Sequence, residues 1–406
     1  MSGEGAELEK YGAAVVDALL RPGECGPPTD EATHAARRRA LLEAAARADK
    51  AALSRFGASF LEAYADWIEA HLDEWTTTQR GMLLPDVPYH YMRIRPPADG
   101  EPFHNDDIPP GMIHIANRGP GEKYDFEARE VIDGGFLELV RYGVRRADDP
   151  LIIDSLKVVD HVLKIETPYG ICFRRYNHDG YGQRKDGGPY CGYGQGRAWP
   201  ILTGERAHYE LAAGNDVSSY ITALERFSSF GGMLPEQVWD YADMPSEGMY
   251  FGRSAGSAQP LVWAHAEYIK LLRSVADGVV FDRVSVVADR YAVPKEKRSF
   301  QSRMEIFQVG RPISAMVQGG TLRIMDADRF RVTWTADNWA TKNAQDSRVV
   351  GRPGSFIDIQ TAHDQTGSII FTLFWPEENR WLGRNCEVAV NAEPVPQGTA
   401  ATKPKT

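Results

Sequence analysis

One carboxylate of the chain lies in a stiff and aromatic stretch. Glu236 occurs in FGGMLPEQVWD, directly after Pro235, with two glycines before it and Trp239 after it. Proline fixes the backbone, and a bulky indole can keep water away from a nearby carboxylate. A general base needs a carboxylate held in this way. The alternative is a solvated charge, or a first-turn glutamate that complements a helix dipole.

A glycine-rich loop at 176–200, YNHDGYGQRKDGGPYCGYGQGRAWP, is the second candidate. It contains aromatic residues such as Tyr181 and Trp199, and the arginines Arg184 and Arg197. Flat rings stack on sugar rings, polar side chains bond hydroxyls, and glycine lets backbone approach a ligand. Carbohydrate fits this composition best, because EF-hand and P-loop spacings are missing. An ordered surface loop without a ligand is the open alternative.

Amphipathic helices are expected to position these two loops. Apolar residues at helical spacing predict a long helix within 32–75. Shorter helices are predicted at 136–144, 154–163, 204–213, 216–230 and 260–275. Asp154 and Asp216 occupy expected N-cap positions. Pro260 fits a first helical turn, and Gly214 fits the position after a helix end. Paired antiparallel helices, with their long loops gathered on one face, follow from this pattern.

The pattern changes beyond Arg311 to alternating, β-branched runs. Strands are predicted at 321–327, 330–337, 355–362 and 368–375. They predict a small antiparallel β domain. Trp334 and Trp339 either pack in the core of a sandwich or form a sugar-binding surface. The polar tail at 396–406 is predicted to be disordered.

The composition excludes several classes of protein. With 406 residues and 43% apolar residues, the chain can form two domains or one large domain with an appendage. Its net charge of -10, with both signs interspersed, argues against a nucleic-acid partner. No apolar run of about 18 residues and no signal pattern occur, which favours a cytoplasmic protein without a membrane partner. Four widely spaced cysteines favour free thiols over a disulfide framework or a zinc site.

Several longer runs carry a resemblance to a known family. GYGQGRAWPILTGERAHYELAAG (192–214), GGMLPEQVWD (231–240) and GSAQPLVWAHAEYIKL (256–271) resemble glycoside hydrolase family 15, of the bacterial glucoamylase and glucodextranase type. DSLKVVDHVLKIETPYG, RRYNHDGYG and FWPEENRWLGRN resemble further segments of the same family. The resemblance extends from about residue 47 to residue 391.

This resemblance implies a fold and a site. Family members have an (α/α)6 barrel of twelve helices in two rings, and they release β-glucose from non-reducing ends of α-glucans with inversion, without a cofactor or a metal. The family's general base falls on Glu236, and its substrate-holding arginine falls on Arg197. Beside that arginine, the resemblance implies a subsite wall of Trp199, Glu205 and Arg206. Tyr181 and Trp239, from the two loops above, complete the predicted substrate-binding residues.

The chain also departs from the family pattern. Inverting hydrolysis needs an acid carboxyl as well as a base. The family's acid lies in a Trp-Glu-Glu motif, which does not occur in this sequence. Glu24, in LLRPGECGPPTDE, is the nearest carboxylate and the candidate general acid. The family's first barrel helices and its N-terminal β-sandwich have no counterpart either, so the chain resembles the later half of such an enzyme.

These observations lead to one set of expectations. We expect a mainly α protein with a degenerate segment at 1–45, an incomplete (α/α)6 barrel at 46–310 and a β domain at 311–395. The expected activity is exo-hydrolysis of an α-glucan or oligosaccharide, as in glucan 1,4-α-glucosidases. A glucodextranase acting on α-1,6 links and a non-catalytic glucan-binding remnant are the alternatives. An open half-barrel would expose apolar helix faces, which predicts self-association or pairing with a missing barrel half.

Overall fold

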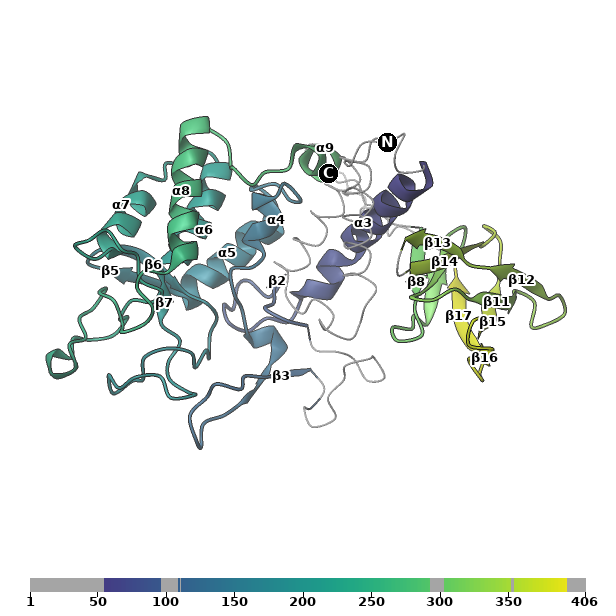
Figure 1. Ribbon diagram of the computed structural model, residues 1–406, viewed down its shortest axis with the longest axis horizontal. Coiled ribbons are helices and arrows are strands. Elements are labelled where there is room, and N and C mark those ends of the chain that lie inside the picture. Colours follow the sequence, from purple (N-terminus) through teal and green to yellow (C-terminus); the bar gives the residue numbers. More distant parts are fainter. Residues whose placement is uncertain (1–54, 96–108, 110, 293–302, 352–353, 393–406) are drawn as a thin grey trace, which may run out of the picture. The chain divides into compact units, whose positions relative to one another are not determined.

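The computed structural model describes residues 55–95, 109, 111–292, 303–351 and 354–392 (Figure 1). Contacts divide the chain into two compact units. The helical unit holds the described residues from Ile68 to 292. The β unit holds the residues of α3 (Arg55–Thr76) up to Trp67, together with those from 303 onward. The predicted segment 1–45, with Glu24, and the predicted tail lie outside these ranges.

The helical unit is built from short helices joined by long loops. After α3, its helices are α4 (Leu137–Arg141), α5 (Pro150–Val162), α6 (Pro200–Ala212), α7 (Ser218–Phe227), α8 (Val262–Asp277) and α9 (Ser285–Tyr291), with 3-10 turns at Ala128–Glu130 and Pro245–Glu247. Its strands form three small antiparallel sheets, β1 (Thr77–Thr78) with β2 (His90–Tyr91), β3 (Met112–His114) with β4 (Asp125–Glu127), and β5 (Lys164–Thr167) with β6 (Gly170–Arg174) and β7 (Ala198–Trp199). The predicted helices are confirmed with shifted ends, whereas α9 was not predicted.

The helix ends confirm one of the predicted start and stop signals and contradict two others. Gly214 follows α6 with φ +82°, a conformation that suits glycine, as predicted. The predicted cap at Asp154 is wrong, because Asp149 caps α5 by accepting a hydrogen bond from Leu151 N at 2.9 Å. Pro260 was also misplaced, because α8 begins only at Val262.

Helix α6 is the centre of the helical unit and packs against α4, α7 and α8. Gly204 allows the approach of α8, since a Cβ there would lie 2.7 Å from Cγ of Glu267. The buried Arg141 guanidinium also binds Glu267, at 2.8 Å, and Asp282, at 2.6 Å. One buried cation therefore holds α4, α8 and the segment after α8 together.

The described helices do not close into a barrel. Helix α8 exposes the apolar side chains of Val262, Ile269, Leu272 and Val275. Exposed apolar faces were predicted for an incomplete barrel, and contiguous patches of this kind often mark interaction surfaces. The pairing of this face with a second copy or with a further barrel half stays a prediction.

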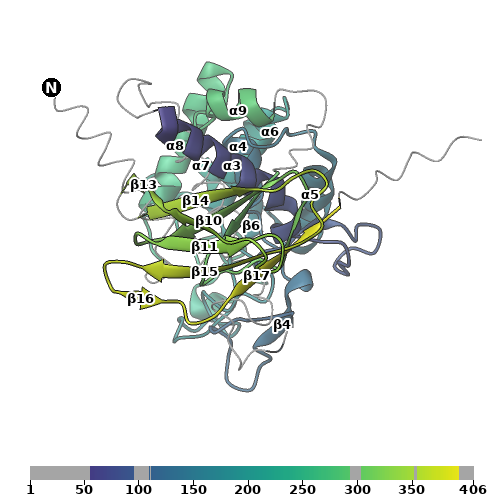
Figure 2. The same cartoon turned by 90° about the vertical axis from the view of Figure 1, so that its right-hand side faces the viewer.

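The β unit is a sandwich of two sheets with one core (Figure 2). One sheet has the order β13 (Arg348–Gly351), β14 (Gly354–Gln360), β10 (Thr321–Asp326) and β8 (Met304–Phe307). The other has the order β12 (Asn343–Asp346), β11 (Arg331–Thr335), β15 (Gly367–Trp375), β17 (Cys386–Asn391) and β9 (Ala315–Val317), and β16 (Arg380–Trp381) also pairs with β15. Alternation along β15 buries Ile369, Phe371 and Leu373 between the sheets.

The predicted strands are confirmed as β10, β11, β14 and β15, but the domain is not purely antiparallel. β8 pairs with β10, and β9 pairs with β17, in parallel. These short edge strands lie outside the four runs that showed an alternating pattern. The alternation of apolar and polar residues therefore did not predict them. β8 begins at Met304, before the predicted boundary at 311. Trp334 packs against the sandwich core, whereas Trp339 is exposed.

Two further observations concern cysteines and membranes. Cys172 and Cys386 are buried free thiols, and Cys191 is an exposed free thiol. Within the described ranges, no helix has the length and apolar character needed to cross a bilayer.

The Arg141 cluster predicts a large stability effect. Arg141→Met should leave the buried Glu267 carboxylate without its guanidinium partner, and only Lys270 would remain at Asp282. Breaking a buried pair in this way typically costs about 3–5 kcal/mol. Unfolding by guanidinium chloride, followed by circular dichroism, measures this loss in the free energy of unfolding. Arg146→Met is the matched control, because Arg146 and Asp148 form an exposed pair worth at most about 1 kcal/mol. Equal stabilities of the two variants would contradict the role given to Arg141.

Candidate active site

The backbone that carries Glu236 is fixed on two sides. Glu236 N–H donates to Ala258 O at 2.8 Å, and Val238 N–H donates to Ala198 O at 2.9 Å. The second bond adds this segment to the edge of β7. Because buried backbone groups must find partners, these bonds hold the segment in one conformation. The rigidity predicted from Pro235 is therefore also imposed by two neighbouring segments.

The Glu236 side chain is enclosed. The residue is 8% exposed, so its carboxylate does not point into bulk solvent. Burial raises the pKa of Tyr181, and a hydrogen bond from its phenol to Glu236 raises it further. Tyr181 is itself held at its backbone, since its N–H donates to Asp179 Oδ1 at 2.9 Å and its carbonyl accepts from Gln237 Nε2 at 3.2 Å. The carboxylate thus has a fixed donor beside it.

An aromatic wall extends from Tyr181. Its ring lies 6.0 Å from that of Trp199 and 5.1 Å from that of Tyr190. Trp263 meets Trp199 edge-on at 6.3 Å. Trp199 Nε1 is buried without a hydrogen-bond partner in the described part of the chain. Aromatic faces with a few polar groups are the typical lining of a ligand site.

Arg175 belongs to this wall, and sequence reasoning missed it. Its guanidinium lies 4.8 Å from the Tyr181 ring centroid and 5.1 Å from that of Trp199. Two hydrogen bonds, from Nε at 2.8 Å and from Nη2 at 2.9 Å, bind it to the buried carboxylate of Asp179. Burial disfavours its charge, but Asp179 outweighs burial and raises the pKa of Arg175. The sequence signal that could have identified this ion pair is the i, i+4 spacing of Arg175 and Asp179 in RRYNHDG.

Arg197 lies deeper than the wall. It is 2% exposed, and its Nε and Nη2 donate to the carbonyls of Gln183 and Arg184, both at 2.9 Å. Its Nη1 donates to Asp240 at 2.8 Å, and its guanidinium stacks on Trp239 at 4.0 Å. Arg197 therefore joins the glycine-rich loop to the segment after Glu236. Its predicted contact with substrate stays a prediction.

Trp239 is held in the same layer as Arg197. Its indole is fully buried, and Nε1 donates to Ala242 O at 2.8 Å. The structure places its ring against the Arg197 guanidinium. It therefore supports the site through Arg197, and the predicted shielding of Glu236 by this indole stays a prediction.

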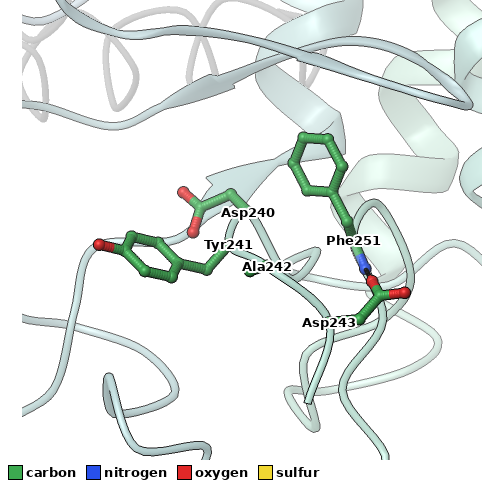
Figure 3. A pocket seen from close by; sticks show the side chains of 5 residues that line it. All are labelled: Asp240, Tyr241, Ala242, Asp243 and Phe251. Atoms are coloured by element: carbon green, nitrogen blue, oxygen red, sulfur yellow. Dashed lines mark hydrogen bonds between the residues drawn. The ribbon is translucent and has the colours of Figure 1, made fainter. Parts of the chain in front are cut away.

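A pocket of about 420 Å³ opens beside this layer (Figure 3). It is lined by Asp240, Tyr241, Ala242, Asp243 and Phe251. Asp240 is fixed by Arg174 Nε at 2.7 Å in addition to Arg197. Asp243 accepts a hydrogen bond from Phe251 N at 2.7 Å. Asp240 lies four residues after Glu236 and lines the pocket. The ion pairs that Asp240 forms with Arg174 and Arg197 therefore shape the pocket as well as the site.

Glu205 and Arg206 lie among the helices. Arg206 binds Asp160 at 2.5 Å and Glu210 at 2.8 Å, which links α5 to α6. Burial, with the charges of Glu138 and Glu267, raises the pKa of Glu205 to about 8. The structure places Arg206 in the packing of these two helices, and the role of Glu205 and Arg206 in the sugar site stays a prediction. No group of three or more potential metal ligands occurs in the described ranges.

A comparison with known families gives the class of protein. Residues 24–273 match the family described as Glycosyl hydrolases family 15, which is more than half of the chain. The chain belongs to this family.

Two similar proteins are glucoamylases. The glucoamylase of Clostridium sp. (strain G0005) is 42% identical over 227 residues, which cover 56% of this chain and 29% of that protein. A crystal structure of a bacterial glucoamylase complexed with acarbose matches with a TM-score of 0.57 and 35% identity. That match covers 70% of this chain and 41% of the solved chain, so this chain spans less than half the length of either relative.

Glu205 predicts a pH dependence of stability. Its pKa of about 8 when folded exceeds the ordinary value of 4.5, so between these pH values the folded protein keeps a proton that the unfolded chain releases. The free energy of unfolding should fall as pH rises through this window. Glu205→Gln removes the effect and should stabilise the protein at pH 8 by about 4 kcal/mol, and little at pH 4.5.

Chemical denaturation at both pH values checks this difference. Glu166→Gln is the control, because Glu166 is an exposed partner of Lys164. A Glu205→Gln difference that is the same at pH 4.5 and pH 8 would show that Glu205 ionises normally.

Proposed function

We propose that this chain hydrolyses α-glucans from their non-reducing ends with inversion, and that Glu236 is its general base. The observation that carries the proposal is the enclosed Glu236 carboxylate on a tied backbone, beside Tyr181. A base is effective when its position is set before the substrate arrives. Membership of the family and the similarity to two glucoamylases support this reaction class.

In the proposed mechanism, Glu236 takes a proton from a water molecule. That water attacks C1 of the terminal sugar from the face opposite the leaving oxygen, so the configuration at C1 inverts. A second carboxyl must protonate the leaving oxygen. Glu24, outside the described residues, is the proposed acid. Without acid assistance the rate would fall by about 10²- to 10⁴-fold.

The sugar is held by the wall of the site. Tyr181 and Trp199 supply aromatic faces, and the Trp199 N–H is a donor without a partner in the described protein. Arg175 adds a charged donor that Asp179 keeps in one orientation. We assign Arg197 the role of positioning this loop, because its three nitrogens already donate to protein oxygens.

The proposal has two forms, which differ in the glycosidic linkage that the enzyme cleaves. The names of the similar proteins favour a glucan 1,4-α-glucosidase. A glucodextranase acting on α-1,6 links would use the same base. Turnover of maltose and soluble starch, compared with turnover of dextran, assigns the linkage. The anomeric form of the released glucose, followed by NMR, tests inversion.

A second candidate function is glucan binding without turnover. The observation that favours it is the absence of Trp-Glu-Glu from the sequence. A binding protein would still need the aromatic wall and Arg175, but it would not need Glu236 as a base. Binding of maltooligosaccharides with no released glucose would support this candidate over the hydrolase.

Glu236→Gln tests the base. The amide keeps the shape of the side chain but cannot accept a proton from water, so kcat should fall by about 10²- to 10⁴-fold. Glucose release from maltose and soluble starch measures the loss. Glu247→Gln is the matched control, because Glu247 is an exposed residue of a nearby turn. If Glu236→Gln turned over glucan at the wild-type rate, Glu236 would not be the base.

Arg175→Lys tests which arginine holds the sugar. Lysine keeps the charge but loses the two-point bond to Asp179, so KM should rise by about tenfold or more while the fold persists. Arg197→Lys should instead reduce stability, because Arg197 is deeply buried. Steady-state kinetics and thermal unfolding separate the two. An unchanged KM in folded Arg175→Lys would remove Arg175 from the site.

A further inference from the structure

A row of four side chains crosses the outer face of the six-stranded sheet in the β unit. Asp346 of β12 lies opposite Arg331 of β11. Arg331 lies opposite Phe374 of β15, and Phe374 lies opposite Trp381 of β16. Residues directly opposite each other on paired strands point to the same face. With strands about 4.8 Å apart, the row is about 14 Å long.

This row faces away from the sandwich core. Along β15, Leu373 and Trp375 are buried in the core, and Phe374 between them points to the other side. Trp381 is 55% exposed. The side chains of Arg331 and Asp346 are 51% and 65% exposed. A ligand therefore has access to both ends of the row.

The two ends of the row are fixed and chemically different. At one end, the Trp381 and Phe374 rings lie 4.9 Å apart with an interplanar angle of 39°. At the other end, Arg331 binds Asp346 through two hydrogen bonds of 2.7 and 2.9 Å. The row thus presents an aromatic platform beside an ordered pair of donors and acceptors.

Few ligands match both ends. An apolar protein surface would bury the ion pair away from water, which is costly. A nucleic acid would meet the Asp346 carboxylate and a chain with a net charge of -10. A chain of pyranose rings has apolar C–H faces that stack on aromatic rings and hydroxyl edges that pair with guanidinium and carboxylate. Carbohydrate matches the whole row.

We propose that Asp346, Arg331, Phe374 and Trp381 form a non-catalytic binding site for a glucan chain. The choice of glucan among polysaccharides rests on the proposed function of the chain. The site differs from the surface that the sequence suggested, because Trp334 packs against the core and Trp339 lies in the loop between β11 and β12.

The test is adsorption of the full chain to insoluble starch and its retardation in gels that contain soluble starch. All variants carry Glu236→Gln, so that hydrolysis does not consume the probe. Trp381→Ala should weaken binding about tenfold, the change that loss of about 1.4 kcal/mol of stacking produces. Arg331→Met should weaken it severalfold. Trp339→Ala, which removes an exposed tryptophan outside the row, should bind as the parent does.

The outcomes separate this inference from the proposed function. Full adsorption by folded Trp381→Ala would overturn the inference, as would an equal loss in Trp339→Ala. If the wild-type chain hydrolyses maltose but does not adsorb to starch, the binding site is wrong and the hydrolase stands. If it adsorbs through Trp381 but releases no glucose, the binding site stands and the hydrolase falls. Circular dichroism confirms that each variant is folded.

Discussion

The backbone of residues 236–239 is the constraint on which the site depends. Its hydrogen bonds run to Ala198 on one side and to Ala258 on the other, so the segment behaves like an added strand beside β7. Glu236 can then be enclosed without being mobile. Because β7 also carries Trp199, the carboxylate and the aromatic wall are held by one small sheet. Their relative position is set by backbone geometry more than by side-chain contacts.

Buried ion pairs form a second layer that supports this small sheet and the aromatic wall. Asp179 orients Arg175 toward the aromatic rings, and Asp240 holds Arg174 and Arg197. Each carboxylate also satisfies donors that would otherwise be buried without partners. The glycines of the loop permit this crowding, since a Cβ at Gly180 would lie 1.7 Å from Asn117 O. The loop is thus shaped by its polar interior, and its aromatic residues form the surface that a ligand meets.

Local patterns predicted four strands of the β unit (β10, β11, β14 and β15) and the stiffness near Glu236, because alternation and Pro235 act within a few residues. The sequence could not show that Ala258 binds the backbone of Glu236, since that pairing depends on tertiary structure. The same limit applies to Arg197, because the sequence could not show that the Asp240 carboxylate and the Trp239 ring surround it in the fold. The contact of Arg197 with substrate, which the resemblance implies, stays a prediction. Arg175 was overlooked because its aromatic neighbours are brought together only by folding.

The depth of Arg197 and Asp240 affects how mutational data on this protein must be read. Both side chains are almost fully shielded, and both hold the scaffold around the base. A saturation screen scored on glucose release alone would rank them as essential, alongside the base itself. Such a ranking would combine lost architecture with any lost contact to sugar. Abundance measured in parallel with turnover distinguishes the two causes.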